Sequence, residues 1–188
     1  MMKRLLLIFF LVVSASAIAQ KGQFMTVEEY QQKIFSTPIP WQTLWVSKQG
    51  RDDISNILSR QFMGLRIRYW GEGNKTAWIF EEIGKELPIT VGIAINDGQV
   101  ENVTILEYRE SRGGEVRHDF FTDQFLGSSL ESKSSKNIAN LNTDIDGITG
   151  ATYSVRSLKN MVRLALYCHL LTPFADYQES LSLEEPSP

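Results

Sequence analysis

Hydrophobic and polar positions follow a helical period near both ends of the chain. Apolar residues recur at intervals of three and four in two N-terminal segments, 26–35 and 52–62. The first segment opens with Thr26 and Glu29, which have the spacing of a capping box. A longer amphipathic stripe occupies 154–172, immediately before a proline. We therefore predict two short framework helices and one long C-terminal helix.

The middle of the chain has the alternating period of β-strands. Strand patterns at 65–70 and 76–80 flank a turn that contains glycine. Two further patterns, at 89–95 and 100–108, flank Asn96-Asp97-Gly98, whose residues tolerate the positive φ of tight hairpin turns. These patterns predict a four-stranded antiparallel meander. The expected fold class is α+β, an antiparallel β-sheet packed by N-terminal helices and a C-terminal amphipathic helix.

The segment between the strands and the last helix is less regular. A short helix is expected at 120–126, ended by Gly127. The residues at 128–143 are rich in Ser, Asn and Lys and predict a surface connection, with one weak turn around Ile138. We expect the tryptophans to lie mainly in the core, because large aromatic side chains contribute most to burial. They are Trp41, Trp45, Trp70 and Trp78.

Composition divides the chain into four parts. Residues 1–19 join a charged start to an apolar run and small residues, the pattern of a secretory signal peptide. We predict a helical segment at 20–63, the main domain at 64–173 and a flexible tail at 174–188. The apolar run is too short to span a bilayer. We therefore expect an exported, soluble protein without stable membrane insertion, periplasmic if its host is a Gram-negative bacterium.

Charge and cysteine content narrow the classes of partner. The formal net charge is −3. Removal of the predicted signal peptide would also remove the positive charges of Lys3 and Arg4 and make the net charge more negative. A nucleic acid is not expected to bind such a chain. The single cysteine, Cys168, excludes an intramolecular disulfide and is predicted to be buried in the last helix.

The segment at 146–154, Asp-Gly-Ile-Thr-Gly-Ala-Thr-Tyr-Ser, stands directly before that helix. Its glycines allow a sharp turn and the close approach of a ligand, and the amides at a helix N-terminus favour phosphate. Two plainer readings stay open at this point. Thr152 can serve as an ordinary helix cap, and Asp146 can close an Asx turn.

This segment resembles the flavinylation motif of the FMN-binding domain in the C subunit of sodium-translocating NADH:quinone reductase and the G subunit of the Rnf complex. The resemblance implies that 64–173 is an FMN-binding domain and that Thr152 bears FMN through a phosphoester. It also implies maturation by a magnesium-dependent flavin transferase that takes FMN from FAD and recognises the flanking residues. The motif residues assigned to cofactor binding are Thr152, Asp146, Gly147, Thr149, Gly150, Ala151 and Ser154.

A second stretch is similar to the same family. The loop at 108–114 resembles the family's glycine-containing loop, with Ser-Arg where the family usually has Thr-Pro, and 121–127 resembles its Phe-x-x-Gln-Phe-x-Gly segment. An arginine beside a flavin would stabilise the reduced anion. The resemblance implies that this loop contacts the flavin. Its assigned residues are Glu110, Ser111, Arg112, Gly113 and Gly114.

The expected function is electron transfer by an exported flavoprotein, an electron carrier rather than a stand-alone enzyme. Redox partner proteins, a reductase or a cytochrome, are expected. A reductase of a small substrate and a non-redox binding or assembly protein remain the alternatives. No catalytic residue is assigned, since His118 and His169 lack ligand-like or catalytic neighbours in the sequence. No metal site is predicted, because the acidic pair at 144–146 lacks the later ligands of a calcium loop.

Overall fold

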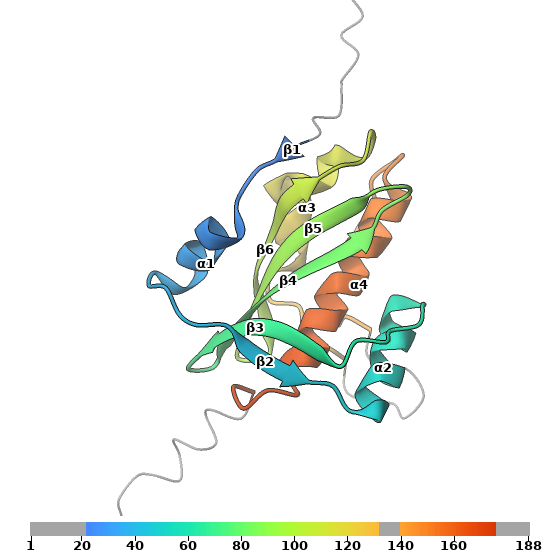
Figure 1. Ribbon diagram of the computed structural model, residues 1–188. Coiled ribbons are helices and arrows are strands. Elements are labelled where there is room, and N and C mark those ends of the chain that lie inside the picture. Colours follow the sequence, from blue (N-terminus) through green and yellow to red (C-terminus); the bar gives the residue numbers. More distant parts are fainter. Residues whose placement is uncertain (1–21, 132–139, 176–188) are drawn as a thin grey trace, which may run out of the picture.

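The computed structural model describes residues 22–131 and 140–175 (Figure 1). The predicted signal peptide, the turn at Ile138 and most of the predicted tail lie outside the described residues. The strands are β1 (Gly22–Gln23), β2 (Gln42–Trp45), β3 (Arg66–Glu72), β4 (Lys75–Ile83), β5 (Pro88–Asn96) and β6 (Gln99–Tyr108). The α-helices are α1 (Val27–Phe35), α2 (Lys48–Leu58), α3 (Asp119–Thr122) and α4 (Thr152–His169), with 3₁₀ turns η1 (Gly114–Arg117) and η2 (Asp123–Phe125).

One antiparallel sheet has the strand order β1-β6-β5-β4-β3-β2. The predicted meander is confirmed as β3 to β6, and the fold class is α+β. The Asn96-Asp97-Gly98 turn forms as expected, with Asp97 at φ 50° and Gly98 at φ 71°. Strands β1 and β2 were not predicted. They place the N-terminal segment at both edges of the sheet.

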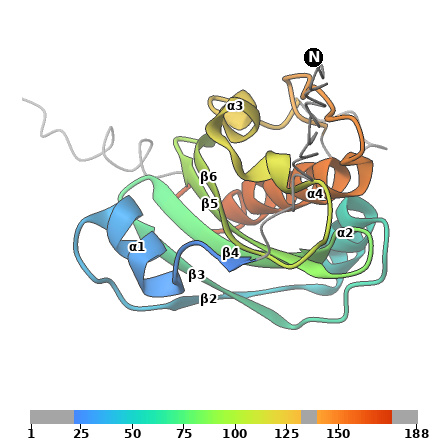
Figure 2. The same ribbon diagram turned by 90° about the horizontal axis from the view of Figure 1, so that it is seen from above.

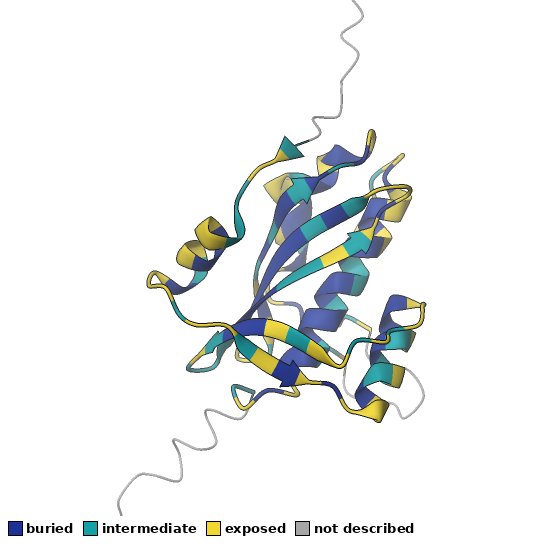
Figure 3. Cartoon of the chain, in the orientation of Figure 1, coloured by how far each residue is buried: buried dark blue, intermediate teal, exposed yellow. Residues whose placement is uncertain are grey.

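Helices cover the two faces of this sheet unequally. In Figure 2, α1 lies on the opposite side of the sheet from α4. Strand β5 shows the division, because successive side chains of a strand point to opposite faces. Its residues Ile89, Val91, Ile93 and Ile95 join the large core under α4, whereas Ala94 joins the small core under α1. The face of α4 toward the sheet is buried along its length (Figure 3).

Gly92 of β5 makes the close approach of α1 possible. A Cβ atom built on Gly92 would lie 2.6 Å from the ring of the fully buried Tyr30. We predict that Gly92→Val lowers the free energy of unfolding by about 1–3 kcal/mol, because the added methyl groups overpack this contact. Urea denaturation measures the change. Gly22→Ala is the control, since its added Cβ has only an ordinary contact at 3.8 Å; equal losses in both variants would contradict the argument.

Several helix boundaries differ from the prediction, and α4 runs from Thr152 to His169 instead of over 154–172. Helix α1 has the predicted capping box, with Thr26 and Glu29 bonded reciprocally. Helix α2 starts earlier than expected, since the Ser47 hydroxyl accepts a hydrogen bond from the amide of Gly50. It also ends earlier, at a residue with positive φ, Ser59. The helix predicted at 120–126 divides into α3 and η2.

The prediction for the tryptophans is correct for two and wrong for two. Trp70 and Trp78 are buried. Trp45, on the edge strand β2, is 71% exposed, and Trp41 is 41% exposed although its ring stacks on Trp70 with centroids 3.7 Å apart. Within β2, Leu44 joins the large core, whereas Trp45 points to the opposite face of the sheet, where α1 contacts β4 and β5. Cys168 is buried, as predicted. Among the described residues, no helix is long and apolar enough to cross a membrane.

Candidate functional site

Thr152 is the first residue of α4, and its side chain is exposed. The residue at the cap position is Ala151, which has no side chain able to cap the helix. The reading of Thr152 as the helix cap is therefore wrong. The first backbone bond at this end runs from the amide of Val155 to the carbonyl of Ala151, at 2.9 Å. The amides that precede it, at 152–154, are not used by the helix itself and point toward its N-terminal end.

A tight turn delivers the chain to this helix end. The amide of Ala151 donates to the carbonyl of Ile148 at 3.0 Å, and Gly150 stands in the turn at φ 83°. That backbone conformation favours glycine. A Cβ atom added to Gly147 or Gly150 would meet nothing within 4 Å, so open space surrounds the turn. The hydroxyl of Thr152 is thus presented on an uncrowded surface beside unused amides.

The loop after β6 is fastened to the start of α4. The hydroxyl of Tyr108 donates to the carbonyl of Arg112 at 2.5 Å and lies 2.9 Å from the hydroxyl oxygen of Ser154. Gly113, at φ 78°, packs on Ala151, since an added Cβ atom would lie 3.1 Å from that of Ala151. Burial raises the pKa of Tyr108, so its phenol stays protonated and able to donate. The structure thus brings together two of the segments that resemble the flavin family.

The third of these segments holds the motif from the other side. The side-chain oxygen of Gln124 accepts a hydrogen bond from the amide of Asp146 at 2.7 Å. Phe121 and Phe125, on either side of Gln124, are buried and meet edge to face. The ammonium of Lys159 on α4 donates to the carbonyl of Ile145 at 3.4 Å. The backbone before Thr152 is therefore fixed by contacts with both η2 and α4.

Glu110 performs a structural task in the same loop. Its carboxylate is buried and accepts hydrogen bonds from the amides of Lys85, Glu86 and Leu87, at 2.5, 2.6 and 2.9 Å. Burial alone would raise the pKa of Glu110, but the three amide bonds outweigh it and hold the pKa below the ordinary value of 4.5. The carboxylate therefore joins the β4–β5 turn to the end of β6. Its predicted contact with the flavin stays a prediction.

We expect Glu110→Gln to lower the free energy of unfolding by about 1–2 kcal/mol at neutral pH, because neutral glutamine replaces a charged acceptor. The folded-state pKa is depressed, so this contribution is fully present above pH 4.5 and is lost as the pH falls through the folded-state pKa. Urea denaturation at a series of pH values measures it. Glu86→Gln, an exposed neighbour, is the control. A stability difference that did not shrink in acid would count against this role.

The other predicted site residues surround the start of α4 in different ways. Ser154, Gly113 and Gly114 are buried. The exposed members are Asp146, Gly147, Thr149, Gly150, Ser111 and Arg112. The structure adds Tyr108 and Gln124, to which the sequence had assigned no role. The signal for Tyr108 was an aromatic residue at the end of a strand, directly before a glycine-containing loop.

A comparison with known protein families matches the part of the chain that holds this site. Residues 84–167 match the family model described as FMN-binding domain. No curated protein matches the chain. The match runs from the β4–β5 turn into α4, and so includes the loop after β6, the segment around Gln124 and the motif before Thr152. It supports FMN as the ligand, and the exposed hydroxyl, open turn and helix amides fit a flavin phosphate. Over residues 84–167 the chain is therefore similar to the FMN-binding domain family.

Proposed function

We propose that this protein is an exported electron carrier whose FMN is esterified through its phosphate to Thr152. The observation that supports the proposal most is the position of this hydroxyl. It is exposed, it opens α4, and a positive-φ glycine precedes it by two residues. The family match supports FMN, and Thr152 offers an exposed hydroxyl as the first residue of α4, where a phosphate is favoured.

The start of α4 would hold the phosphate through its backbone amides, and the small residues before it would leave room for the phosphate. The unused amides at 152–154 carry the positive end of the helix dipole, which favours a negative phosphate by about 0.3–1 kcal/mol at an exposed site. Gly150 and Ala151 present little side-chain bulk beside the acceptor. Tyr108 and Gln124 fix the loop, so Thr152 keeps its orientation. FMN, when bound, supplies one- and two-electron redox chemistry.

Attachment would follow the route implied by the family. The hydroxyl oxygen of Thr152 attacks the FMN phosphorus of FAD, the pyrophosphate bond breaks, and AMP leaves. The hydroxyl proton goes to solvent or to a base of the magnesium-dependent transferase. This step requires that a second protein reach the acceptor. The exposure of Thr152 and the open space around Gly147 and Gly150 support that requirement.

Export gives a physical reason for a covalent link. The pattern at 1–19 is that of a signal peptide, so the mature chain would act outside the cytoplasm, in the periplasm of a Gram-negative host. A flavin lost there by dissociation would not be replaced from the cytoplasmic pool. A phosphoester prevents that loss and leaves the isoalloxazine ring free for redox chemistry. The redox partner would be a reductase or a cytochrome-type protein.

A redox titration tests the carrier role. The protein is purified from cells that also export a flavin transferase, reduced with dithionite, separated from the reductant and mixed with ferricyanide. We expect stoichiometric reoxidation of one flavin per chain. The same protein mixed with NADH alone should stay oxidised, as a carrier requires a separate reductase. Continuous turnover of NADH and ferricyanide by the isolated chain would instead favour a reductase, and a chain without flavin would overturn the proposal.

A further inference from the structure

Strands β3 and β4 separate soon after their shared turn. They pair at three positions next to the turn, from Glu72 with Lys75 to Trp70 with Ala77. Beyond these pairs β3 continues with β2, and β4 continues with β5. Figure 1 shows the two strands spreading apart toward α2. Within the described chain, β4 after Ala77 therefore has a strand partner on one side alone, and a wedge opens in the sheet.

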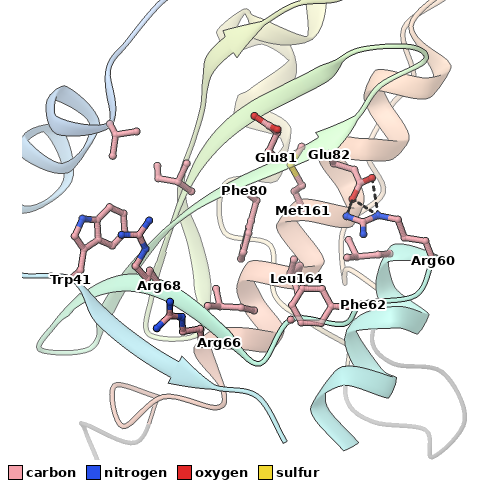
Figure 4. Close-up of a pocket in the computed structure, with 15 residues that line it drawn as sticks. Trp41, Arg60, Phe62, Arg66, Arg68, Phe80, Glu81, Glu82, Met161 and Leu164 are labelled. Atoms are coloured by element: carbon pink, nitrogen blue, oxygen red, sulfur yellow. Dashed lines mark hydrogen bonds and ion pairs between the residues drawn. The ribbon is translucent and has the colours of Figure 1, made fainter. Parts of the chain in front are cut away.

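A cavity of about 460 Å³ occupies this wedge (Figure 4). Met161 and Leu164 of α4 lie at its base, and Phe62, Ile67 and Phe80 line it while remaining partly exposed. Its volume is within the range of small-molecule sites, roughly 300–1,000 Å³. Partly exposed apolar side chains in a concave site favour a ligand with an apolar body.

Arginines give the rim of the cavity its charge. Arg60 is paired with Glu82 at 2.8 Å, and Glu81 with Arg109 at 3.3 Å. Figure 4 shows Arg66 and Arg68 on the other side of the cavity from Arg60.

Neither Arg66 nor Arg68 forms an ion pair with a described residue. The guanidinium of Arg68 lies 5.4 Å from the centre of the Trp41 ring. Two uncompensated cations beside apolar walls select a negative group attached to an apolar body.

The cavity is distinct from the start of α4. Met161 and Leu164 follow Thr152 by nine and twelve residues in that helix. At a rise of about 1.5 Å per residue, they lie roughly 14 and 18 Å along the helix axis from the site of attachment. None of the residues fastened around Thr152 lines the cavity.

We propose that this cavity binds a small amphiphilic organic anion. Its carboxylate, sulfonate or phosphate lies against Arg66 and Arg68, and its flat apolar body lies between Phe62 and Phe80 over α4. The inference does not depend on flavin attachment, because it rests on residues that the proposed electron-transfer site does not use.

Calorimetric titration with two matched probes tests the proposal. Anilinonaphthalene sulfonate has an aromatic body and one negative group, and phenylnaphthylamine has the same body without the charge. We expect saturable one-to-one binding of the sulfonate and binding of the neutral probe that is weaker by about tenfold or more. Both the purified protein and its Thr152→Ala variant are titrated. Equal affinity in these two proteins separates this site from the flavin.

Three variants locate the site. The double variant Arg66→Gln, Arg68→Gln should reduce sulfonate affinity by at least about tenfold and leave the neutral probe unchanged. Lys48→Gln with Lys85→Gln, two exposed lysines away from the cavity, should change neither. Ile67→Trp should exclude both probes while circular dichroism shows a folded chain. Equal affinity for the two probes, or sulfonate binding unchanged by the double arginine variant, would overturn the proposal, as would no binding to the parent chain.

Discussion

Thr152→Val is expected to abolish covalent flavin completely. Valine has the shape of threonine without the hydroxyl, so the phosphoester cannot form. The residue is exposed and its side chain bonds to no described residue, so the free energy of unfolding should change by no more than about 0.5 kcal/mol. Flavin fluorescence of the denatured protein after electrophoresis measures the attachment. Thermal unfolding of the unlabelled chain measures the stability.

Thr143→Val provides the matched control for this loss. Thr143 is exposed and stands three residues before the motif at 146–154, so it precedes α4 in the sequence as the motif does. It should retain full flavin fluorescence under the same co-expression with a transferase. Fluorescence that persisted in the Thr152→Val chain would assign the attachment to another residue, and loss in both variants would indicate a general failure of maturation.

Gly113→Ala should be the most damaging single methyl addition near the site. Gly113 has a positive φ, which costs an alanine about 1–2 kcal/mol. The added Cβ would also lie 3.0 Å from the Tyr108 hydroxyl and 3.1 Å from the Cβ of Ala151. Overpacking adds about 1–3 kcal/mol. We expect a total loss of roughly 2–5 kcal/mol in the free energy of unfolding. Flavin incorporation should also fall, because Ala151, which packs against Gly113 next to Thr152, would be displaced.

Gly98→Ala separates the two causes of that loss. Gly98 has a similar positive φ, 71°, but an added Cβ would meet nothing within 4 Å. It should lose only the backbone contribution, about 1–2 kcal/mol, and incorporate flavin normally. Urea denaturation and the flavin content of both variants give the comparison. Equal destabilisation and equal flavin content would show that the contact between Gly113 and Ala151 does not hold the motif.

The sheet was predictable where strands alternate over many residues. Strands β3 to β6 are long, and the Asn96-Asp97-Gly98 turn fixes one hairpin by local backbone preference. Strands β1 and β2 have two and four residues, too few for a period to show. They form because their neighbours in the sheet supply hydrogen-bond partners, which is a tertiary effect.

Helix ends depended on capping side chains more than on hydrophobic period. The Thr26–Glu29 box was visible as a spacing, so α1 began where expected. Ser47 also caps a helix, but α2 begins with polar residues, and the apolar period marked only its later part. Sequence reasoning therefore placed the start of α2 several residues too late.

The candidate site was predictable as a motif but not as an arrangement. The glycines and small residues before Thr152 indicated a helix N-terminus open to a phosphate. The task of Glu110 was not visible, because its three amide partners lie 23 to 25 residues earlier in the chain. Gln124 and Tyr108 act on the motif through long-range contacts of the same kind. Only the folded chain brings those partners together.

The intact mass of the purified chain tests the central claim most directly. The protein is co-expressed with an exported flavin transferase, denatured to release any loosely bound flavin, and weighed by mass spectrometry together with a chain produced without the transferase. The account predicts an increase equal to one FMN less one water, and fragmentation should place it on the peptide that contains Thr152. An unchanged mass, alongside a known substrate that the same transferase does modify, would contradict the account.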